Sequence, residues 1–155
     1  MATLVFGERI GKSARIRTGC SAAILDAERH KVLLQRRADN GRWGLPGGGM
    51  DSGESAAETC AREVLEETGL QVKVTRLIGI YTNPHFIIEY ADGNRWQIVA
   101  FHFEAEVIGG EPTLNEETEA LAYFSPSEIE QLDLMEHHRE RIKDTFTQQQ
   151  QTFIR

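Results

Sequence analysis

A glycine-rich segment, Ala38–Glu54, is predicted to form a loop, and the helix predicted directly after it has the clearest sequence signals in this chain. Ser55 and Glu58 have the spacing of a capping box, in which the Ser hydroxyl accepts from the Glu N–H and the Glu side chain reaches back to the Ser N–H. Gly69 can take the left-handed conformation that ends a helix. The two signals predict a helix over about Ala56 to Thr68, around which the rest of the chain must fold.

The predicted helix has one apolar side and one acidic side. At about 100° per residue, the side expected to pack on a sheet consists of Ala57, Cys60, Ala61, Val64 and Thr68. Glu63, Glu66 and Glu67 lie within an arc of about 100° away from that side, and we expect both Glu66 and Glu67 to face solvent. Because exposed like charges at this spacing cost only about 0.2–0.5 kcal/mol per pair, a solvated acidic surface is the alternative to a functional site.

The segments around this helix read as a mixture of strands and further helices. Apolar and β-branched runs predict strands over Ile16–Leu25, Lys31–Arg37, Val72–Thr82, Arg95–Val107 and Ala120–Ser125. Helical patterns cover Ser125–Leu132 and Met135–Phe146, and we expect a frayed polar tail over Thr147–Arg155. Strands and helices mixed along one chain of 155 residues predict one domain with a sheet covered by helices.

Composition excludes several classes of partner and location. The net charge of -7 repels nucleic acid at long range, so a phosphate-bearing ligand must be held locally by a metal, by a few arginines or by backbone N–H groups. Cys20 and Cys60 lack metal-ligand spacing and are expected to be reduced and buried. We find no signal peptide core and no apolar run long enough to span a membrane, and the expected location is the cytoplasm.

The segment from Gly48 to Leu70 resembles the Nudix hydrolase signature at every specified position. The matching residues are Gly48, Glu54, Arg62, Glu63, Val64, Glu66, Glu67, Gly69 and Leu70. The resemblance implies the α/β class, with one α/β/α sandwich domain and a mixed β-sheet over residues 1–155. It also implies hydrolysis of the diphosphate bond in nucleoside diphosphate-linked compounds, with ADP-ribose or a nucleotide sugar favoured over ordinary or oxidised nucleoside triphosphates.

A divalent metal site is part of what the resemblance implies. Carboxylate oxygens suit hard cations such as Mg²⁺, which keeps some water and completes its shell from substrate phosphate. Mg²⁺ is the expected cofactor and Mn²⁺ a possible substitute. The implied metal ligands are Glu63, Glu66, Glu67 and Gly48. Glu54 and Arg62 are assigned to structural support, because a guanidinium that binds a carboxylate in fixed geometry keeps loop and helix in register.

The general base is left open by the sequence. Bound metals would polarise phosphoryl oxygens and activate a water, and a nearby carboxylate would take the proton of that water. The resemblance implies Glu63 or Glu66 of the signature, or Glu117 in a later acidic loop, as catalytic residues, with Glu119 as the second choice in that loop. A plain acidic surface loop is the alternative for this last group.

Substrate contacts are predicted from residues that flank the glycine-rich loop. The candidates are Arg36, Arg37, Gly47 and Tyr81, with Arg42 as a further arginine near the loop. His137 and His138 show no metal-ligand arrangement and are expected on a solvated helix face. A non-catalytic nucleotide-binding or sensor module of the same fold is the alternative function, and a homodimer is an option that relatives of this family often show.

Overall fold

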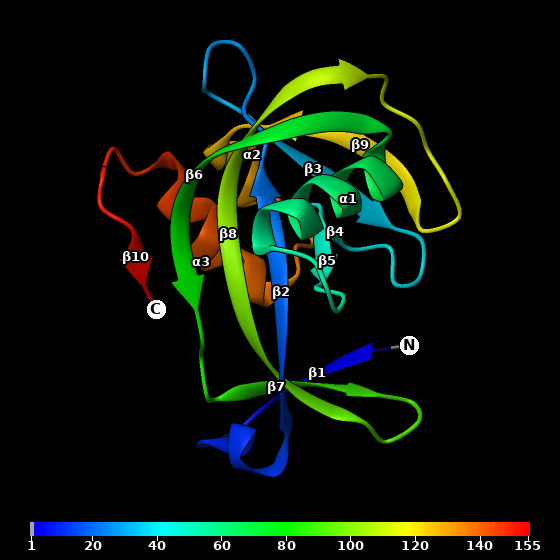
Figure 1. The fold of residues 1–155 in the computed structure, drawn as a ribbon, viewed down its shortest axis with the longest axis vertical. Helices are drawn as coiled ribbons and strands as arrows, with labels where there is room; N and C mark the ends of the chain where they lie inside the picture. Colours follow the sequence, from blue (N-terminus) through cyan, green and yellow to red (C-terminus); the bar gives the residue numbers. More distant parts are fainter. Residues whose placement is uncertain (1) are drawn as a thin grey trace.

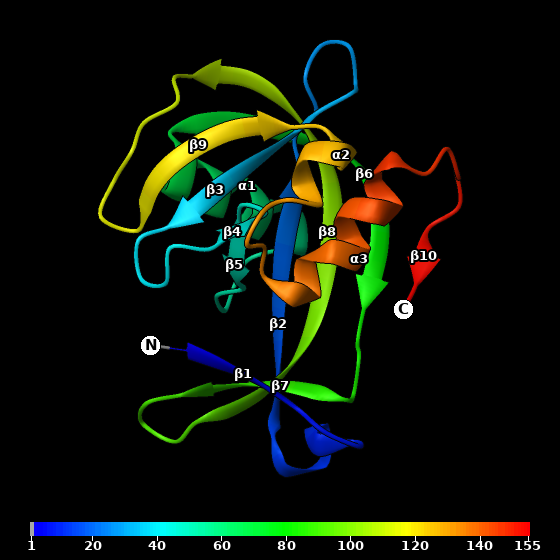
Figure 2. The ribbon, with the colours of Figure 1, turned by 180° about the vertical axis from the view of Figure 1, so that it is seen from behind.

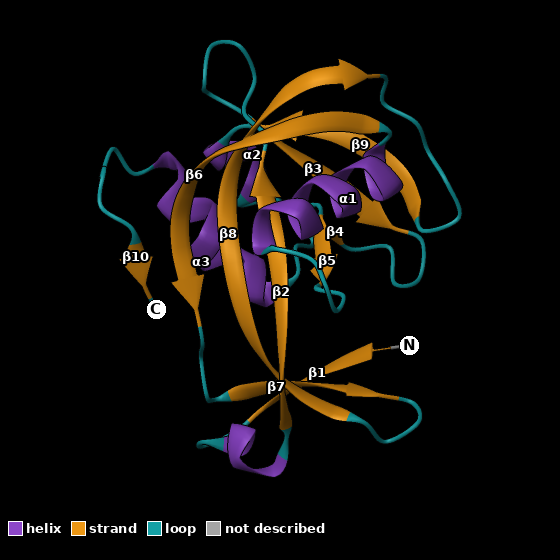
Figure 3. Ribbon diagram, viewed as in Figure 1, coloured by secondary structure: helices purple, strands orange, loops and turns teal. Residues whose placement is uncertain are grey.

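The computed structural model describes residues 2–155, which contain both strands and helices (Figure 3). The elements are β1 Ala2–Phe6, the 3-10 helix η1 Ile10–Ser13, β2 Arg15–Ala23, β3 Val32–Arg37, β4 Trp43–Gly44, β5 Gly47–Gly49, α1 Ala56–Thr68, β6 Leu70–Tyr81, β7 Phe86–Tyr90, β8 Arg95–Gly110, β9 Thr118–Phe124, α2 Pro126–Ile129, α3 Glu136–Phe146 and β10 Phe153–Ile154.

The larger sheet is built around the long strand β8. This strand pairs in parallel with β2, and on its other side it pairs antiparallel with β6 and, nearer its start, with β7. The sheet is extended by β1 beside β7, by β10 parallel to β6, and by β5 antiparallel to β2. Parallel and antiparallel pairs therefore occur in one sheet, as predicted (Figure 1).

Helices cover the two faces of the pair β2 and β8. Figure 1 shows α1 in front of these strands and α3 behind them, and Figure 2 shows the same arrangement from the other side. A smaller sheet has the order β4-β3-β9. This arrangement confirms the predicted fold class, a sandwich of helices around a mixed sheet. No helix within residues 2–155 is long and apolar enough to cross a lipid bilayer.

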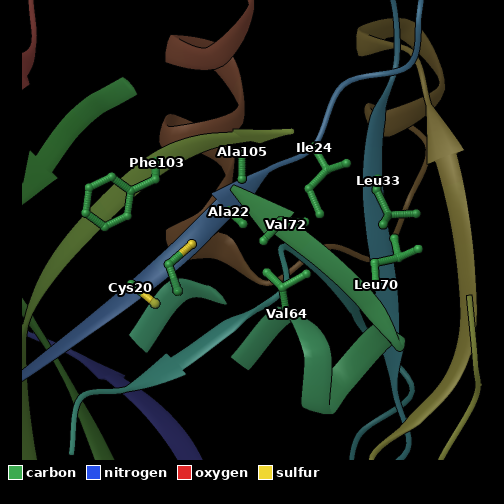
Figure 4. Close-up of a cluster of buried hydrophobic side chains, with 10 residues drawn as sticks. Cys20, Ala22, Ile24, Leu33, Val64, Leu70, Val72, Phe103 and Ala105 are labelled. Atoms are coloured by element: carbon green, nitrogen blue, oxygen red, sulfur yellow. The ribbon is translucent and has the colours of Figure 1, made fainter. Parts of the chain in front are cut away.

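Two apolar clusters, one on each face of the larger sheet, fix the positions of α1 and α3. The cluster under α1 contains Cys20, Ala22, Ile24, Leu33, Cys60, Val64, Leu70, Val72, Phe103 and Ala105 (Figure 4). The cluster on the α3 side contains Ala23, Val32, Leu34, Leu45, Ile78, Ile129, Leu134 and Ile142. Full burial of a Val, Leu or Ile side chain contributes about 1.5–3 kcal/mol, so neither helix can move without a large loss.

Several short strands lie where the sequence predicted loops or tails. Strands β4 and β5 form inside the glycine-rich segment, and β1, β7 and β10 were not predicted at all. Each is completed by a remote partner: β1 pairs with β7, and their Phe6 and Phe86 rings lie 5.7 Å apart. Five residues or fewer carry too little periodicity for a strand to be predicted, and the pairing that stabilises such a strand is tertiary.

Candidate active site

The ends of α1 are set by the local signals that the sequence contains. The Ser55 hydroxyl accepts from the Glu58 N–H at 3.2 Å, and the Glu58 carboxylate accepts from the Ser55 N–H at 2.7 Å. Gly69 ends the helix with φ of 75°. Cys60 and Val64 are fully buried against the sheet. The helix is therefore fixed at both ends and along one side, so its carboxylates project from a rigid element.

Arg62 links the helix to the loop that precedes it. Its Nε and Nη2 atoms donate to the two oxygens of Glu54 at 2.5 and 3.0 Å, and Nη2 also donates to the carbonyl oxygen of Gly49 at 3.1 Å. Thr59 donates to the same Glu54 carboxylate at 2.8 Å. The Arg62 guanidinium, with the Asp51 N–H and the Thr59 hydroxyl, lowers the pKa of Glu54 to about 2. Arg62 thus joins Glu54 and Gly49 of the loop to α1.

Arg62 also lies between two of the three acidic side chains. Its Nη1 donates to Glu63 at 3.0 Å and to Glu66 at 3.1 Å, so one cation is shared by two carboxylates. The Glu66 side chain is 58% exposed and that of Glu63 only 15%. Burial raises the pKa of Glu63, against the effect of Arg62. Within residues 2–155, no three His, Cys, Asp or Glu side chains are gathered at metal-binding distances.

Glu67 is buried, which corrects the expectation that it faces solvent. Only 6% of the residue is exposed, and its Oε2 accepts from the Gly47 N–H at 3.3 Å and from the side-chain amide of Gln35. Loss of solvation raises the pKa of Glu67 to about 8 despite these donors. The prediction failed because Glu67, next to the apolar side of α1, faces β5. This strand, Gly47–Gly49, is called the glycine strand below, and its lack of side chains leaves room for a carboxyl group.

The glycines of β5 are required by close approach of other groups. A Cβ atom at Gly48 would lie 2.5 and 2.6 Å from the two carboxylate oxygens of Glu63. A Cβ atom at Gly47 would lie 2.7 Å from the Cα atom of Ser21 in β2, and Gly47 also has φ of 153°. The backbone of β5 therefore lies directly beside the acidic side of α1, a distance that only glycine allows.

The acidic loop before β9 is fastened to the end of α1. Asn115 donates to the carbonyl oxygens of Glu66 at 2.8 Å and Glu67 at 3.2 Å, and its own side-chain oxygen accepts from the Glu117 N–H at 2.9 Å. The charge of Glu117 contributes to the raised pKa of Glu63. Glu119 is instead paired with Arg36 at 2.7 Å. Sequence reasoning overlooked Asn115, which holds Glu117 near the signature carboxylates.

A cleft of about 200 Å³ opens on the other side of the glycine strand, toward α3. It is lined by Gly47, Gly48 and Gly49 and by Arg37, which is paired with Asp39 at 2.9 Å. Other predicted contacts do not reach it. Arg36 is absent from the lining and Arg42 is held by Asp133 and Glu136. Tyr81 is buried and donates to Asp144 at 2.7 Å.

The cleft is also lined by basic residues that sequence reasoning did not assign to it. Arg17 lies against Gly49, where a Cβ atom would be 2.5 Å from its Nη2. His137, His138 and Arg141 of α3 form part of the wall, which corrects the expectation that the His pair lies on a solvated face. Desolvation lowers the pKa of His137 to about 3. The spacing of Arg141 three and four residues after the His pair is the signal that places all three on one helix side.

Known proteins share both sequence and fold with this chain. The model of the NUDIX domain family matches residues 16–146. A putative 8-oxo-dGTP diphosphatase of Bacillus subtilis is 34% identical over 76% of this chain and 72% of its own length. An ADP-ribose pyrophosphatase of Methanocaldococcus jannaschii is 33% identical over 74% of this chain and 65% of its own.

A solved structure, that of a UDP-X diphosphatase, superposes with a TM-score of 0.73 at 25% identity and covers 90% of this chain and 68% of that one. The family match thus extends from the second strand to the last helix and includes the signature, the acidic loop and both walls of the cleft. The chain belongs to the Nudix hydrolase family, whose members act on small nucleotide compounds and generally use divalent metal ions.

Proposed function

We propose that this protein hydrolyses the diphosphate bond of nucleoside diphosphate-linked compounds or nucleoside triphosphates, with Mg²⁺ as cofactor and Mn²⁺ as a substitute. The observation that carries the proposal is the position of Gly47–Gly49. This strand touches the signature carboxylates on one side and lines the cleft on the other. A nucleotide in the cleft would have its phosphates beside the carboxylates. ADP-ribose and nucleotide sugars are the first substrates to test, in line with the names of the relatives.

The donor chemistry of the site fits a divalent cation. Glu63 and Glu66 present oxygens on either side of Arg62 Nη1, and the backbone of Gly48 lies against Glu63. We propose Glu63, Glu66, Glu67 and Gly48 as the groups that would hold the metal. Binding would move the exposed Glu66 side chain away from Arg62 and would require Glu67 to release a proton. A bound metal would supply electrophilic activation of the phosphate and of the attacking water.

The remaining groups have roles that follow from their contacts. Arg62 and Glu54 keep the helix and the glycine strand together, so that cation ligands and substrate stay in register. Glu117 is exposed and held beside the end of α1 by Asn115. We propose that it, or Glu63 or Glu66, accepts the proton of the attacking water. We keep Arg37 as a proposed phosphate contact and propose Arg17 in place of Arg36, because Arg17 and Arg37 line the cleft.

A nucleotide panel tests the proposal. The panel contains ADP-ribose, nucleotide sugars, the common nucleoside triphosphates and 8-oxo-dGTP, each with Mg²⁺ or Mn²⁺, and products are identified by mass. We expect cleavage between two phosphates in at least one compound, and none in the presence of a chelator. If no compound is cleaved while nucleotides still bind, the non-catalytic binding module replaces this proposal. Gel filtration and sedimentation test the homodimer, and cell fractionation the predicted cytoplasmic location.

A further inference from the structure

Arg141 is a buried cation with no counter-charge. It lies on α3 in the wall of the cleft, is 5% exposed, and forms no ion pair with any carboxylate of residues 2–155. A buried charge without a partner is strongly unfavourable, and such groups are normally paired or neutralised. Burial lowers the pKa of Arg141 to about 10, so the side chain keeps its charge at neutral pH. A ligand with acceptor oxygens would reduce the unfavourable free energy of this buried charge.

A closed ring of hydrogen bonds with three uncharged side chains holds Arg141 in place. Its Nη1 donates to the Ser21 hydroxyl at 3.3 Å, and that hydroxyl is 2.8 Å from His102 Nδ1. His102 Nε2 is 2.8 Å from the hydroxyl of Thr145, which donates back to the Arg141 carbonyl oxygen at 2.9 Å. Because the Thr145 hydroxyl donates its one proton to the Arg141 carbonyl oxygen, His102 Nε2 is the donor in its contact with Thr145. Desolvation lowers the pKa of His102 to about 3, so the ring is neutral and its Nδ1 accepts from the Ser21 hydroxyl.

The ring positions the guanidinium without satisfying it. Ser21, His102 and Thr145 are all buried and carry no charge. Arg141 Nε is sealed from solvent without a partner. Nη2 makes no hydrogen bond with residues 2–155 and is not among the sealed atoms. The side chain lines the cleft and also a smaller cavity beside Tyr81, so the guanidinium keeps a donor without a partner in the protein.

His138 supplies a second donor in the same wall. Its Nδ1 accepts from the Leu45 N–H at 2.9 Å, and Gly44 packs so closely that a Cβ atom there would be 2.9 Å from this nitrogen. Burial lowers the pKa of His138 well below its usual value, so the ring is neutral and its proton is on Nε2. This N–H makes no hydrogen bond with the described residues. The α3 wall of the cleft therefore carries hydrogen-bond donors, and a ligand that binds there must carry acceptors.

We propose that Arg141 and the Nε2–H of His138 bind a carbonyl oxygen edge of the nucleobase, so that the cleft prefers bases with an oxo group to bases with an amino group at the same position. The volume of about 200 Å³ accommodates a base rather than a whole nucleotide. A guanidinium is the usual partner of the adjacent O6 and N7 acceptors of guanine. Adenine presents an amino donor at that position, and a donor facing a donor is unfavourable.

This inference rests on the proposed function for the identity of the ligand as a nucleotide, and it orders the substrates within that class. Guanine, hypoxanthine and uracil compounds come before adenine and cytosine compounds. ADP-ribose therefore becomes less favourable than GDP- or UDP-linked sugars. A purely structural role is the competing account, since the guanidinium also lies 5.5 Å from the centre of the Tyr81 ring and borders a smaller cavity beyond it.

Matched nucleotide pairs separate these accounts without any hydrolysis. Dissociation constants are measured by calorimetry in a chelator, for IDP against ADP and for UDP against CDP, because the members of each pair differ in an oxo or amino group. In the unsubstituted protein we expect the oxo member to bind about tenfold more tightly. Similar affinities within both pairs, or no binding of any of the four, would overturn the proposal, whatever the panel of substrates shows.

Arg141→Met removes the guanidinium and keeps most of the side-chain length. We expect the preference within each pair to fall to less than twofold, and the unfolding temperature of the nucleotide-free variant to be no lower than that of the parent. The control is Arg139→Met, because Arg139 is exposed on the same helix and bonds only to the Leu132 carbonyl oxygen. Equal weakening of both members of a pair would assign Arg141 to a phosphate, and a destabilised variant with unchanged preference would assign it to structure; either result overturns the proposal.

Discussion

The two faces of the strand pair β2 and β5 carry opposite uncompensated charge. On the α1 face, Glu63 and Glu66 share one cation, Arg62, and the buried Glu67 has no contact with it. On the α3 face, Arg141 is surrounded by neutral histidines and has no carboxylate partner within residues 2–155. The three glycines of β5 lie beside Glu63 and also line the cleft whose wall contains Arg141. Each face is unfavourable by itself, and a metal ion together with an acceptor-rich nucleotide would stabilise both at once.

The two faces also differ in how they are held. The acidic face depends on ionic contacts that a metal would have to replace, whereas the basic face depends on a ring of neutral hydrogen bonds that a ligand would leave intact. We therefore expect metal binding to rearrange side chains on α1 and nucleotide binding to leave α3 unchanged. The predictions below test this asymmetry, beginning with the largest expected effect.

Removing one negative charge from the acidic face should abolish most turnover. In Glu63→Gln and Glu66→Gln, we expect kcat/KM to fall on the order of 10²–10³-fold, because a metal contributes several kcal/mol to the transition state. The unfolding temperature of Glu66→Gln should stay near that of the parent, since this side chain is 58% exposed. The control is Glu106→Gln, an exposed carboxylate on β8. Full activity of both variants at limiting Mg²⁺ would show that the metal does not bind to Glu63 and Glu66.

Adding one methyl group beside Glu63 should reduce turnover while the fold survives. In Gly48→Ala the new Cβ atom meets only the flexible end of the Glu63 side chain, which can move away. We expect about a tenfold loss of kcat/KM, equivalent to about 1.4 kcal/mol, with a small change in unfolding temperature. Gly7→Ala is the matched control, because its nearest contacts are at 3.6 Å. An active Gly48→Ala protein would show that Glu63 need not stay where it is.

The buried Glu67 should make the metal-free protein less stable at alkaline pH. Its pKa is raised from 4.5 to about 8, so the contribution of the protonated form is fully present below pH 4.5 and is lost as pH rises through about 8. We expect the free energy of unfolding, measured in a chelator, to fall by a few kcal/mol as pH rises through about 8, because a pKa change of one unit corresponds to about 1.4 kcal/mol. Chemical denaturation of the parent and of Glu67→Gln from pH 5 to 9 measures this. The variant should show a flatter profile, and equal slopes would contradict the buried neutral carboxyl.

Detaching the acidic loop should have the smallest effect. Asn115→Ala removes two hydrogen bonds to the end of α1 and two that shape the loop. Because these bonds are exposed or only partly buried, we expect a loss of about 1 kcal/mol in stability and a few-fold fall in kcat. Asn94→Ala, in the turn between β7 and β8, is the control. If kcat is unchanged, Glu117 has no part in the reaction, and one of the α1 carboxylates must accept the proton.

Sequence reasoning succeeded where the signal is local. The ends of α1 follow from the capping box of Ser55 and the glycine that ends the helix, and the structure confirms both. A sheet covered by helices was predicted from the element order, and the mixed sheet and the family were predicted from the resemblance of Gly48–Leu70 to the signature. The helix ends and the signature are each contained in one continuous segment of the chain, so no knowledge of distant contacts was needed to predict them.

The errors concern residues whose surroundings come from distant parts of the chain. Glu67 is buried because Gln35 and the glycine strand meet it, and neither position is evident from a helical wheel. His137 and His138 were placed in solvent because the polar helix α3 gave no sign that the sheet faces this side. Arg141 was overlooked for the same reason: its burial and its missing counter-ion exist only in the assembled fold.

The carboxyl-terminal strand β10 makes the glutamine stretch before it a closed loop rather than a free end. The Arg155 N–H donates to the Ile80 carbonyl oxygen at 2.8 Å, and the Arg155 carbonyl oxygen accepts from the Thr82 N–H at 2.8 Å. The Arg155 guanidinium donates to the Asp144 carboxylate at 2.9 Å. Because the entropy of closing a loop grows only by about 0.6 kcal/mol for each doubling of its length, added glutamines would be tolerated. Loss of Arg155, by contrast, would remove its backbone pairing with β6 and its ion pair with Asp144, and would leave Tyr81 as the hydrogen-bond partner of Asp144.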